Sequence, residues 1–199
     1  MIHRYILLLI GALLITLGSS LGVAQEITCP EKSLFINISS ERVRAVQVGL
    51  LVAFANAAPP EMEGVNGQGA AVQLFFADAA APYVIDSDKL SHSQRHRLDG
   101  YLRKTFGYGI SDVERLQSQN LMVDGLPGIF AMRDMFGAQV FACSLCVSET
   151  LHAIHLEVDG LELMDYLIEG AELMTPPGFS VIYDIETEDC STKAAVISF

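Results

Sequence analysis

Short apolar runs separated by helical patterns constrain the fold of this chain more than any other sequence feature. Residues 34–38, 71–77 and 139–143 form three such runs, and the second is apolar on both faces, as a central parallel strand is. A helical spacing of apolar residues starts near Glu41, behind Ser40 as its expected N-cap, and stops before Pro59. This alternation predicts an α/β protein with a mainly parallel sheet covered on both faces.

The rest of the chain continues the pattern less evenly. Residues 86–124 are polar and are expected to be partly helical. Further helices are predicted over about 126–135 and 148–154, and another is predicted to begin at about 161. A late strand is predicted over 179–185, and the apolar end at 194–199 is expected to dock as a final strand.

The N-terminus has the composition of an export signal. A short basic stretch around Arg4 precedes an apolar stretch over residues 5–17, and Gly22, Val23 and Ala24 provide the small residues of a cleavage site. The apolar stretch is shorter than the roughly 20 residues that span a bilayer. We therefore expect residues 1–24 to be a signal peptide and the protein to be exported, either to the periplasm or out of the cell. After cleavage we expect no membrane attachment. An uncleaved membrane anchor is the alternative.

Cleavage would leave 199 − 24 = 175 residues, which suits a single domain over residues 25–199. Loss of Arg4 would take the formal net charge from −12 to −13. A protein so acidic lacks the basic footprint of a nucleic-acid-binding protein. The sequence also lacks a phosphate-binding glycine loop, a Gly-x-Ser-x-Gly elbow and a His-Glu-x-x-His motif, so nucleotide hydrolysis, ester hydrolysis and zinc proteolysis have no support. We expect no cofactor.

Cys143 and Cys146 form a CxxC pair directly after the apolar run 139–142. Open α/β sheets bind ligands at the carboxyl ends of their strands, which is where this pair is expected. The first thiol of a CxxC often ionises near neutral pH and becomes a nucleophile. The pair therefore predicts thiol chemistry, with Cys143 as the attacking sulfur and Cys146 as the resolving one.

Polar residues at the ends of the other predicted strands are candidates for supporting roles. Asn37 follows the first strand and Asp78 the second, so both are expected at the same sheet edge as Cys143. Ser144 and Ser148 would add hydroxyl donors, and the amino end of the helix predicted from Ser148 would favour a thiolate. For Asn37 and Asp78, a role in turns or caps is the competing interpretation.

As an ordered set, four stretches resemble the DsrE/DsrF-like family of small sulfur-relay and peroxiredoxin-like proteins. They are 32–38, 72–80, 139–143 and 161–185. The resemblance implies a flavodoxin-like three-layer sandwich that assembles as a homo-oligomer, a trimer or hexamer. It also implies that the cysteine after the third strand, here Cys143, accepts a persulfide. Cys146 and the export signal are departures from the cytoplasmic relay members.

A metal site is an alternative for the same segment. Cys143, Cys146, His152 and His155 are zinc-type ligands, although five residues between the thiols and the histidines leave a strained geometry. His92 and His96 share a helical spacing, but neighbouring arginines favour a solvated basic face there. We expect no metal at either place.

The other two cysteines, Cys29 and Cys190, lie near the two ends of the mature chain. An exported protein with four cysteines permits three pairings, and a Cys29–Cys190 disulfide with a separate redox pair is the economical one. A bond between subunits through Cys190 is the alternative.

Charge is distributed unevenly along the chain. Six basic residues crowd the segment 89–115, whereas no Lys or Arg occurs between Arg133 and Lys193, a stretch that holds twelve acids. Neighbouring subunits with such faces could meet through charge complementarity, although two solvated faces explain the pattern as well. Two function classes follow from the sequence: a thiol-dependent sulfur-handling or redox protein with an unknown partner protein, and a non-catalytic oligomeric binding protein with a structural CxxC disulfide.

Overall fold

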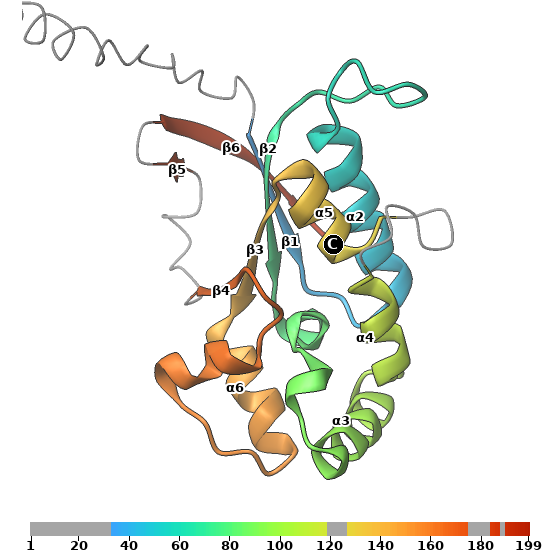
Figure 1. The fold of residues 1–199 in the computed structure, drawn as a ribbon, viewed down its shortest axis with the longest axis vertical. Helices are drawn as coiled ribbons and strands as arrows, with labels where there is room; N and C mark the ends of the chain where they lie inside the picture. Colours follow the sequence, from blue (N-terminus) through green and yellow to red (C-terminus); the bar gives the residue numbers. More distant parts are fainter. Residues whose placement is uncertain (1–32, 119–126, 175–183, 188–189) are drawn as a thin grey trace, which may run out of the picture.

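A computed structural model describes residues 33–118, 127–174, 184–187 and 190–199 (Figure 1). One six-stranded sheet has the strand order β4-β3-β2-β1-β6-β5. Its strands are β1 (Ser33–Ile38), β2 (Ala71–Phe76), β3 (Gln139–Cys143), β4 (Ala171–Met174), β5 (Asp184–Thr187) and β6 (Cys190–Ser198). Only the pairing of β5 with β6 is antiparallel. The predicted flavodoxin-like α/β sandwich with a mainly parallel sheet is confirmed. The prediction that helices cover both faces is not, because α2 (Val43–Ala57) and α5 (Ile129–Phe136) pack into the core on one face (Figure 1).

Helices cover one face of the sheet because the chain advances in one direction from β1 to β4. Right-handed crossovers that all step the same way leave their helices on the same side. Accordingly, α2 (Val43–Ala57) and α5 (Ile129–Phe136) lie together on one side of the strands (Figure 1). The rings of Phe54 and Phe136 meet edge to face between them, with centroids 5.2 Å apart. Leu34, Ile36 and Ile38 of β1 project into this main core.

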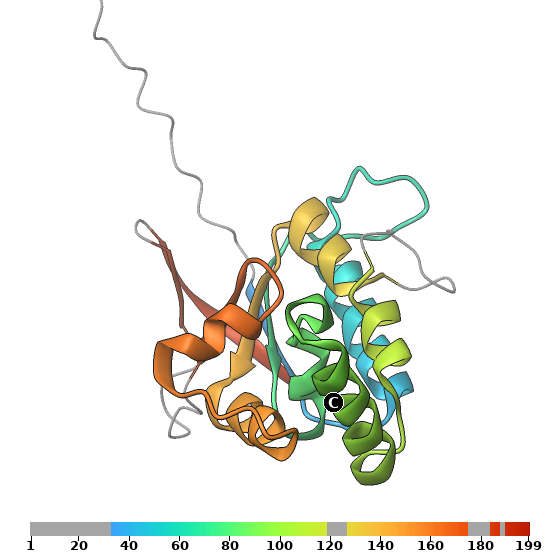
Figure 2. The same cartoon turned by 60° about the horizontal axis from the view of Figure 1, so that its bottom comes forward.

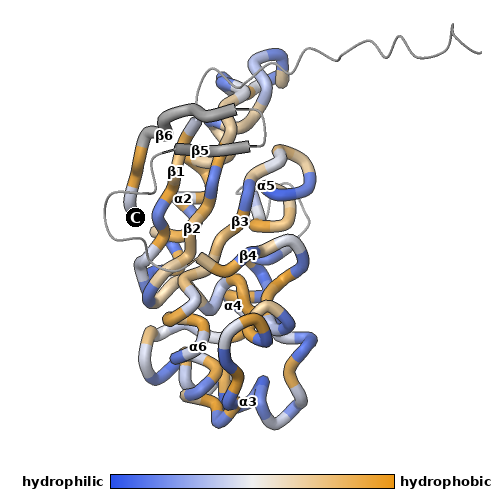
Figure 3. Tube along the Cα trace, turned by 90° about the vertical axis from the view of Figure 1, so that its left-hand side faces the viewer, coloured by the Kyte–Doolittle hydropathy of each residue, from blue (hydrophilic) through white to orange (hydrophobic). Residues whose placement is uncertain are grey.

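The opposite face of the sheet carries a second, smaller cluster. Side chains alternate between the faces of a strand, so Phe35, Phe75, Ala77 and Cys143 gather there. The rings of Phe35 and Phe75 lie 5.9 Å apart, centroid to centroid. Figure 3 looks onto this side of the sheet, with β6, β1, β2 and β3 in front of α2. The first cysteine of the CxxC therefore lies on the face opposite the main core.

The chain segments beyond the carboxyl edge of the sheet form the lower half of the molecule. They are η1 (Asp78–Val84), η2 (Ser87–Lys89), α3 (His92–Thr105), α4 (Ile110–Leu116), α6 (Ser144–Ala153) and η3 (Gly160–Tyr166). Helices α3 and α6 come forward side by side in Figure 2. Ser91 and Gln94 form a capping box at the start of α3. The polar segment 86–124 is thus helical in its described part, as predicted.

Several sequence predictions need correction. Helix α2 begins at Val43 after Arg42 as N-cap, because Ser40 accepts a bond from the Arg42 amide (3.2 Å) and forms a turn before the helix. The segment at 161–166 is a 3-10 helix, and the short strand β4 carried too weak an apolar pattern to be predicted. The expected docking of the C-terminal end is confirmed, because β6 pairs in parallel with β1.

Other predictions fall partly or wholly outside the described residues. The predicted signal peptide over 1–24 lies outside the described residues. Most of the strand predicted over 179–185 does as well, and only its last two residues, at the start of β5, are described. Cys29 also lies outside, and only the backbone of Cys190 is described, so the proposed Cys29–Cys190 disulfide stays a prediction. Within the part of the chain that the structure describes, no helix has the length and apolar character needed to cross a membrane.

Candidate functional site

Cys143 lies at the junction of a strand and a helix. Gly137, with a φ of 64°, ends α5 in the left-handed conformation that glycine adopts without steric cost, and β3 follows at once. Cys143 is both the last residue of β3 and the N-cap of α6, and its sulfur is bonded to that of Cys146 across a Cα–Cα distance of 5.3 Å. The CxxC pair therefore forms a disulfide at the amino end of a helix.

The start of α6 corrects the predicted helix over 148–154. The helix begins four residues earlier, at Ser144, because Cys143 itself caps it. Ser144 is consequently the first residue of the helix, and Ser148 lies within the helix rather than at its start. Of the described residues, the Asp78 and Cys146 backbone amides donate to the two sulfurs, and no hydrogen bond from either serine is present.

The two sulfurs differ in accessibility. Cys143 is only 2% exposed and packs within the cluster of Phe35, Phe75 and Ala77. Cys146 is half-buried, and its neighbour Leu145 is 60% exposed. Solvent and reactants therefore reach the pair from the Cys146 side.

Backbone amides from two different elements hold the pair. The Cys146 amide donates to Cys143 Sγ at 3.3 Å, and the Asp78 amide donates to Cys146 Sγ at 3.3 Å. Asp78 has a φ of 46°, a left-handed conformation that is unfavourable for a residue with a Cβ. In this conformation, just after β2, the Asp78 amide points toward Cys146 Sγ, and the Asp78 side chain is exposed.

Of the four predicted supporting residues, only Asp78 is hydrogen-bonded to a sulfur of the pair. Asn37 lies in β1, in register with Phe75 of β2, so β2 separates it from Cys143 on β3. Its Oδ1 atom is buried and has no hydrogen-bond partner among the residues that the structure describes. Asn37 thus shares the sheet face of Cys143 without touching it.

The histidines of the metal alternative lie farther along α6. His152 is exposed in the last turn of the helix, and His155, with a φ of 61°, follows its end. Among the described residues, no three or more His, Cys, Asp or Glu side chains are grouped so that they could hold a metal ion. The zinc alternative gains no support from this placement.

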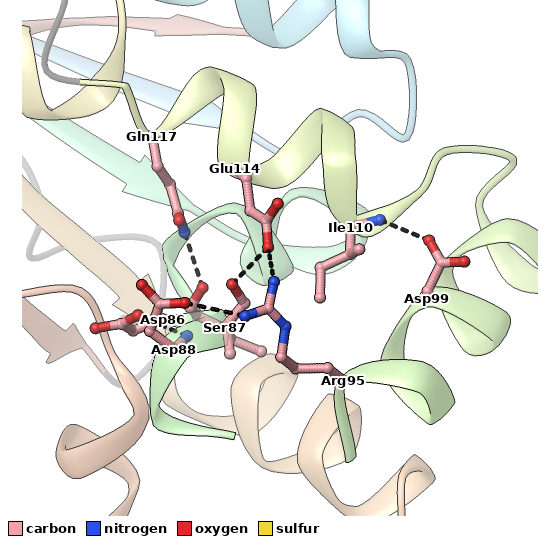
Figure 4. Close-up of polar contacts among 9 residues, drawn as sticks. Asp86, Ser87, Asp88, Arg95, Asp99, Ile110, Glu114 and Gln117 are labelled. Carbon is pink, nitrogen blue, oxygen red and sulfur yellow. Dashed lines mark hydrogen bonds and ion pairs between the residues drawn. The ribbon is translucent and has the colours of Figure 1, made fainter. Parts of the chain in front are cut away.

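A second group of polar side chains lines a cavity of about 460 Å³ in the lower half (Figure 4). Arg95 of α3 lies between two carboxylates, with NH1 3.0 Å from Asp88 Oδ1 and NH2 2.5 Å from Glu114 Oε1. Ser87 also donates to Glu114 Oε1 at 2.8 Å. Gln117 donates to the carbonyl oxygens of Tyr83 and Ile85 at 2.9 and 2.8 Å. We call these residues the Arg95 cluster, and the polar pattern of 86–124 was the only sequence sign of it.

His92 and His96 line a neighbouring cavity of about 510 Å³ with Arg95 and Asp99. Both carboxylate oxygens of Asp99 accept hydrogen bonds. Arg103 Nε donates to Oδ2 at 2.8 Å. The Ile110 amide donates to Oδ1 at 2.9 Å (Figure 4). These hydrogen bonds hold the pKa of Asp99 below its ordinary value. Its carboxylate joins the middle of α3 to the start of α4.

Two buried tyrosines connect this lower half to the cysteine pair. The rings of Tyr83 and Tyr108 stack with centroids 4.8 Å apart, and burial raises the pKa of both phenols. Tyr108 donates to the carbonyl oxygen of Ala79 at 2.6 Å. Because Ala79 follows Asp78, this bond fixes the turn whose amide reaches Cys146. Tyr108 was not predicted as a site residue, because no sequence pattern near it points to a contact with the cysteines.

Comparison of this chain with models of known families, with characterised proteins and with solved structures finds no match.

Proposed function

We propose that this protein is an exported thiol-dependent redox or sulfur-handling protein that acts through Cys143 and Cys146. One observation carries the proposal: the pair forms a disulfide at a strand–helix junction, with one sulfur half-buried and each sulfur accepting a backbone amide. Strand carboxyl ends and helix amino ends are where α/β proteins place reactive groups and stabilise anions. Membership of the DsrE/DsrF-like family is part of this proposal and rests on the ordered sequence resemblance alone.

Sulfur handling by this pair would proceed in two balanced steps. A thiolate of the reduced pair attacks the outer sulfur of a persulfide donor, forms a cysteine persulfide and releases the donor as a thiolate. The second cysteine thiolate then attacks the inner sulfur of that persulfide, which forms the Cys143–Cys146 disulfide and releases hydrosulfide. A Cys143–Cys146 disulfide is the product of this second step, and a reducing thiol would be needed to reopen it.

The second candidate function is a non-catalytic binding protein in which the disulfide is structural. The 2% exposure of Cys143 and its capping of α6 favour it. Closing so small a loop is expected to stabilise the fold by roughly 2 kcal/mol. In that case both sulfurs would serve the junction and neither would react.

The deciding experiment is incubation of the reduced protein with polysulfide, followed by intact-mass analysis. In a Cys29→Ser/Cys190→Ser background, a variant that also lacks one cysteine of the pair cannot close the disulfide and should gain the mass of one sulfur, whereas a variant that lacks both should not. In the same background, the intact pair should release hydrosulfide and form the disulfide, and Glu114→Gln, which alters the Arg95 cluster, is the matched control and should do the same. A pair that stays oxidised in mild reductant and retains no sulfur would reject the carrier function in favour of a structural disulfide.

We further propose that the chain forms a homo-oligomer, a trimer or hexamer. Exposed bases on α3, Arg97, Arg103 and Lys104, are matched by exposed acids in the segment 157–169. Light scattering in low salt should give at least a trimer, and mass should fall in high salt if the charges hold the subunits together. A monomer at micromolar concentration in low salt would contradict this assembly.

A further inference from the structure

The two cysteines of the pair differ in how far each is exposed to solvent. Cys143 is 2% exposed on the sheet face opposite the main core, whereas Cys146 is half-buried one helical turn later. Attack on a disulfide requires the incoming thiolate to reach one sulfur, so the rate depends on which sulfur is accessible. The difference in exposure therefore predicts that an external thiolate reaches Cys146 more easily than Cys143, whatever the pKa values of the two thiols.

The surroundings of Cys146 Sγ leave it at the surface side of the junction. It accepts the amide of Asp78, whose own side chain is exposed, and it follows Leu145, which is 60% exposed. Cys143 is instead one of the buried members of the smaller cluster, with Phe35 and Phe75, whereas Cys146 packs against these members from outside. Because Cys146 is half-buried and Cys143 is only 2% exposed, an external thiol displaces fewer of these side chains to reach Cys146.

The sulfur that leaves must carry negative charge, and Cys143 is placed to do so. Its Sγ accepts the Cys146 amide at 3.3 Å and stands at the amino end of the ten-residue helix α6. Burial among aromatic rings opposes a charge there, but the amide and the helix dipole offset that opposition. Burial thus blocks attack on Cys143 while its amide contact still permits it to leave.

We infer that external thiols exchange with the disulfide at Cys146 and that Cys143 is the leaving and resolving sulfur, the reverse of the order expected from the sequence. This inference rests on the proposed thiol function. An incoming thiolate bonds to Cys146 Sγ, the Cys143–Cys146 bond breaks, and its electron pair remains on Cys143 as a thiolate. A second thiolate then attacks the sulfur of the first, which releases a small-molecule disulfide and leaves Cys146 reduced.

The test compares two single-thiol proteins. In a background of Cys29→Ser and Cys190→Ser, the Cys143→Ser variant keeps only Cys146, and the Cys146→Ser variant keeps only Cys143. Dipyridyl disulfide, a neutral probe, should label the protein that keeps Cys146 at least roughly tenfold faster, because access limits the reaction. Equal rates, or faster labelling of Cys143, would overturn the inference.

Wild-type protein gives a second measurement that depends on no variant. The oxidised protein is mixed with a limiting amount of mercaptoethanol, quenched in acid, and fragmented between residues 143 and 146. The adduct should be on Cys146, and an adduct on Cys143 would overturn the order of attack while leaving the thiol function intact. A disulfide that mercaptoethanol does not open would instead reject the proposed function itself.

Discussion

The Arg95 cluster and the cysteine pair both lie beyond the carboxyl edge of the sheet, but they hold their polar atoms in opposite ways. In the cluster, charged side chains satisfy one another, with Arg95 bound by both Asp88 and Glu114. At the pair, backbone amides of Asp78 and Cys146 hold the sulfurs. The charged side chains of the Arg95 cluster form ion pairs with one another and so link η2, α3 and α4. The sulfurs are held by backbone amides instead, and no charged side chain among the described residues neutralises them. The cavity near Arg95 is therefore a weaker indication of function than the backbone amides that hold the two sulfurs.

The largest expected effect sets the two regions directly against each other. The Cys143→Ser/Cys146→Ser double variant should lose all thiol–disulfide exchange attributable to this pair, because no sulfur remains to form the mixed disulfide. Glu114→Gln should leave the exchange rate unchanged, since no residue of the Arg95 cluster contacts the sulfurs. The measurement is the rate of reduction of a chromogenic disulfide under excess thiol. A comparable loss in Glu114→Gln would mean that the two regions are not independent.

The sequence was sufficient for the elements that form the sheet. The runs at 34–38, 71–77 and 139–143 became β1, β2 and β3 within a residue or two, because buried parallel strands need continuous apolar residues. β4 was missed because its four residues include Glu172 and have little pattern. The start of α6 was placed too late because cysteine is an unusual N-cap and gives no helix-start signal in the sequence.

The site was only partly predictable for a different reason. CxxC spacing and position after a strand identified Cys143 and Cys146, and strand ends identified Asp78. The burial of Cys143 depends on the alternation of side chains along β3. Its odd-numbered residues Phe141 and Cys143 face the smaller cluster around Phe35 and Phe75. The contact of Tyr108 with Ala79 joins residues 29 apart in the chain, and no local pattern encodes it.

Tyr108→Phe is expected to have the second largest effect, because it connects the two regions. Removing the hydroxyl leaves the Ala79 carbonyl without this partner in a buried place, which should lower the free energy of unfolding by about 1 to 3 kcal/mol. The turn that carries the Asp78 amide should also loosen, so Cys146 should react at a changed rate. Denaturant unfolding of oxidised protein gives the stability. Tyr101→Phe, at a half-buried tyrosine, is the control, and an equal loss there would contradict the special role of Tyr108.

Glu114→Gln should have a smaller effect on stability, although it leaves thiol chemistry unchanged. It removes the charge opposite Arg95 but keeps a side-chain oxygen that Ser87 can donate to. Both partners of this ion pair are partly exposed, so the expected loss is only about 0.5 to 1 kcal/mol and should shrink as salt is added. Thermal unfolding in low and high salt measures it. Glu162→Gln, at an exposed acid in η3, should change little, and a loss that is independent of salt would argue against a charge effect.

The smallest expected effect concerns Asp99 and depends on pH. Its pKa is lowered in the folded protein by the hydrogen bonds from Arg103 and the Ile110 amide, so the folded state favours the charged carboxylate. The resulting stability is present above the ordinary aspartate pKa of about 3.9 and is lost as the pH falls through the lowered value. Asp99→Asn should therefore cost a few tenths of a kcal/mol near pH 7, since Asn still accepts the Ile110 amide and the site is close to solvent. Unfolding curves of wild type and variant should converge on acidification, whereas a difference that stays constant down to about pH 3 would show that the charge of Asp99 does not stabilise the α3–α4 junction.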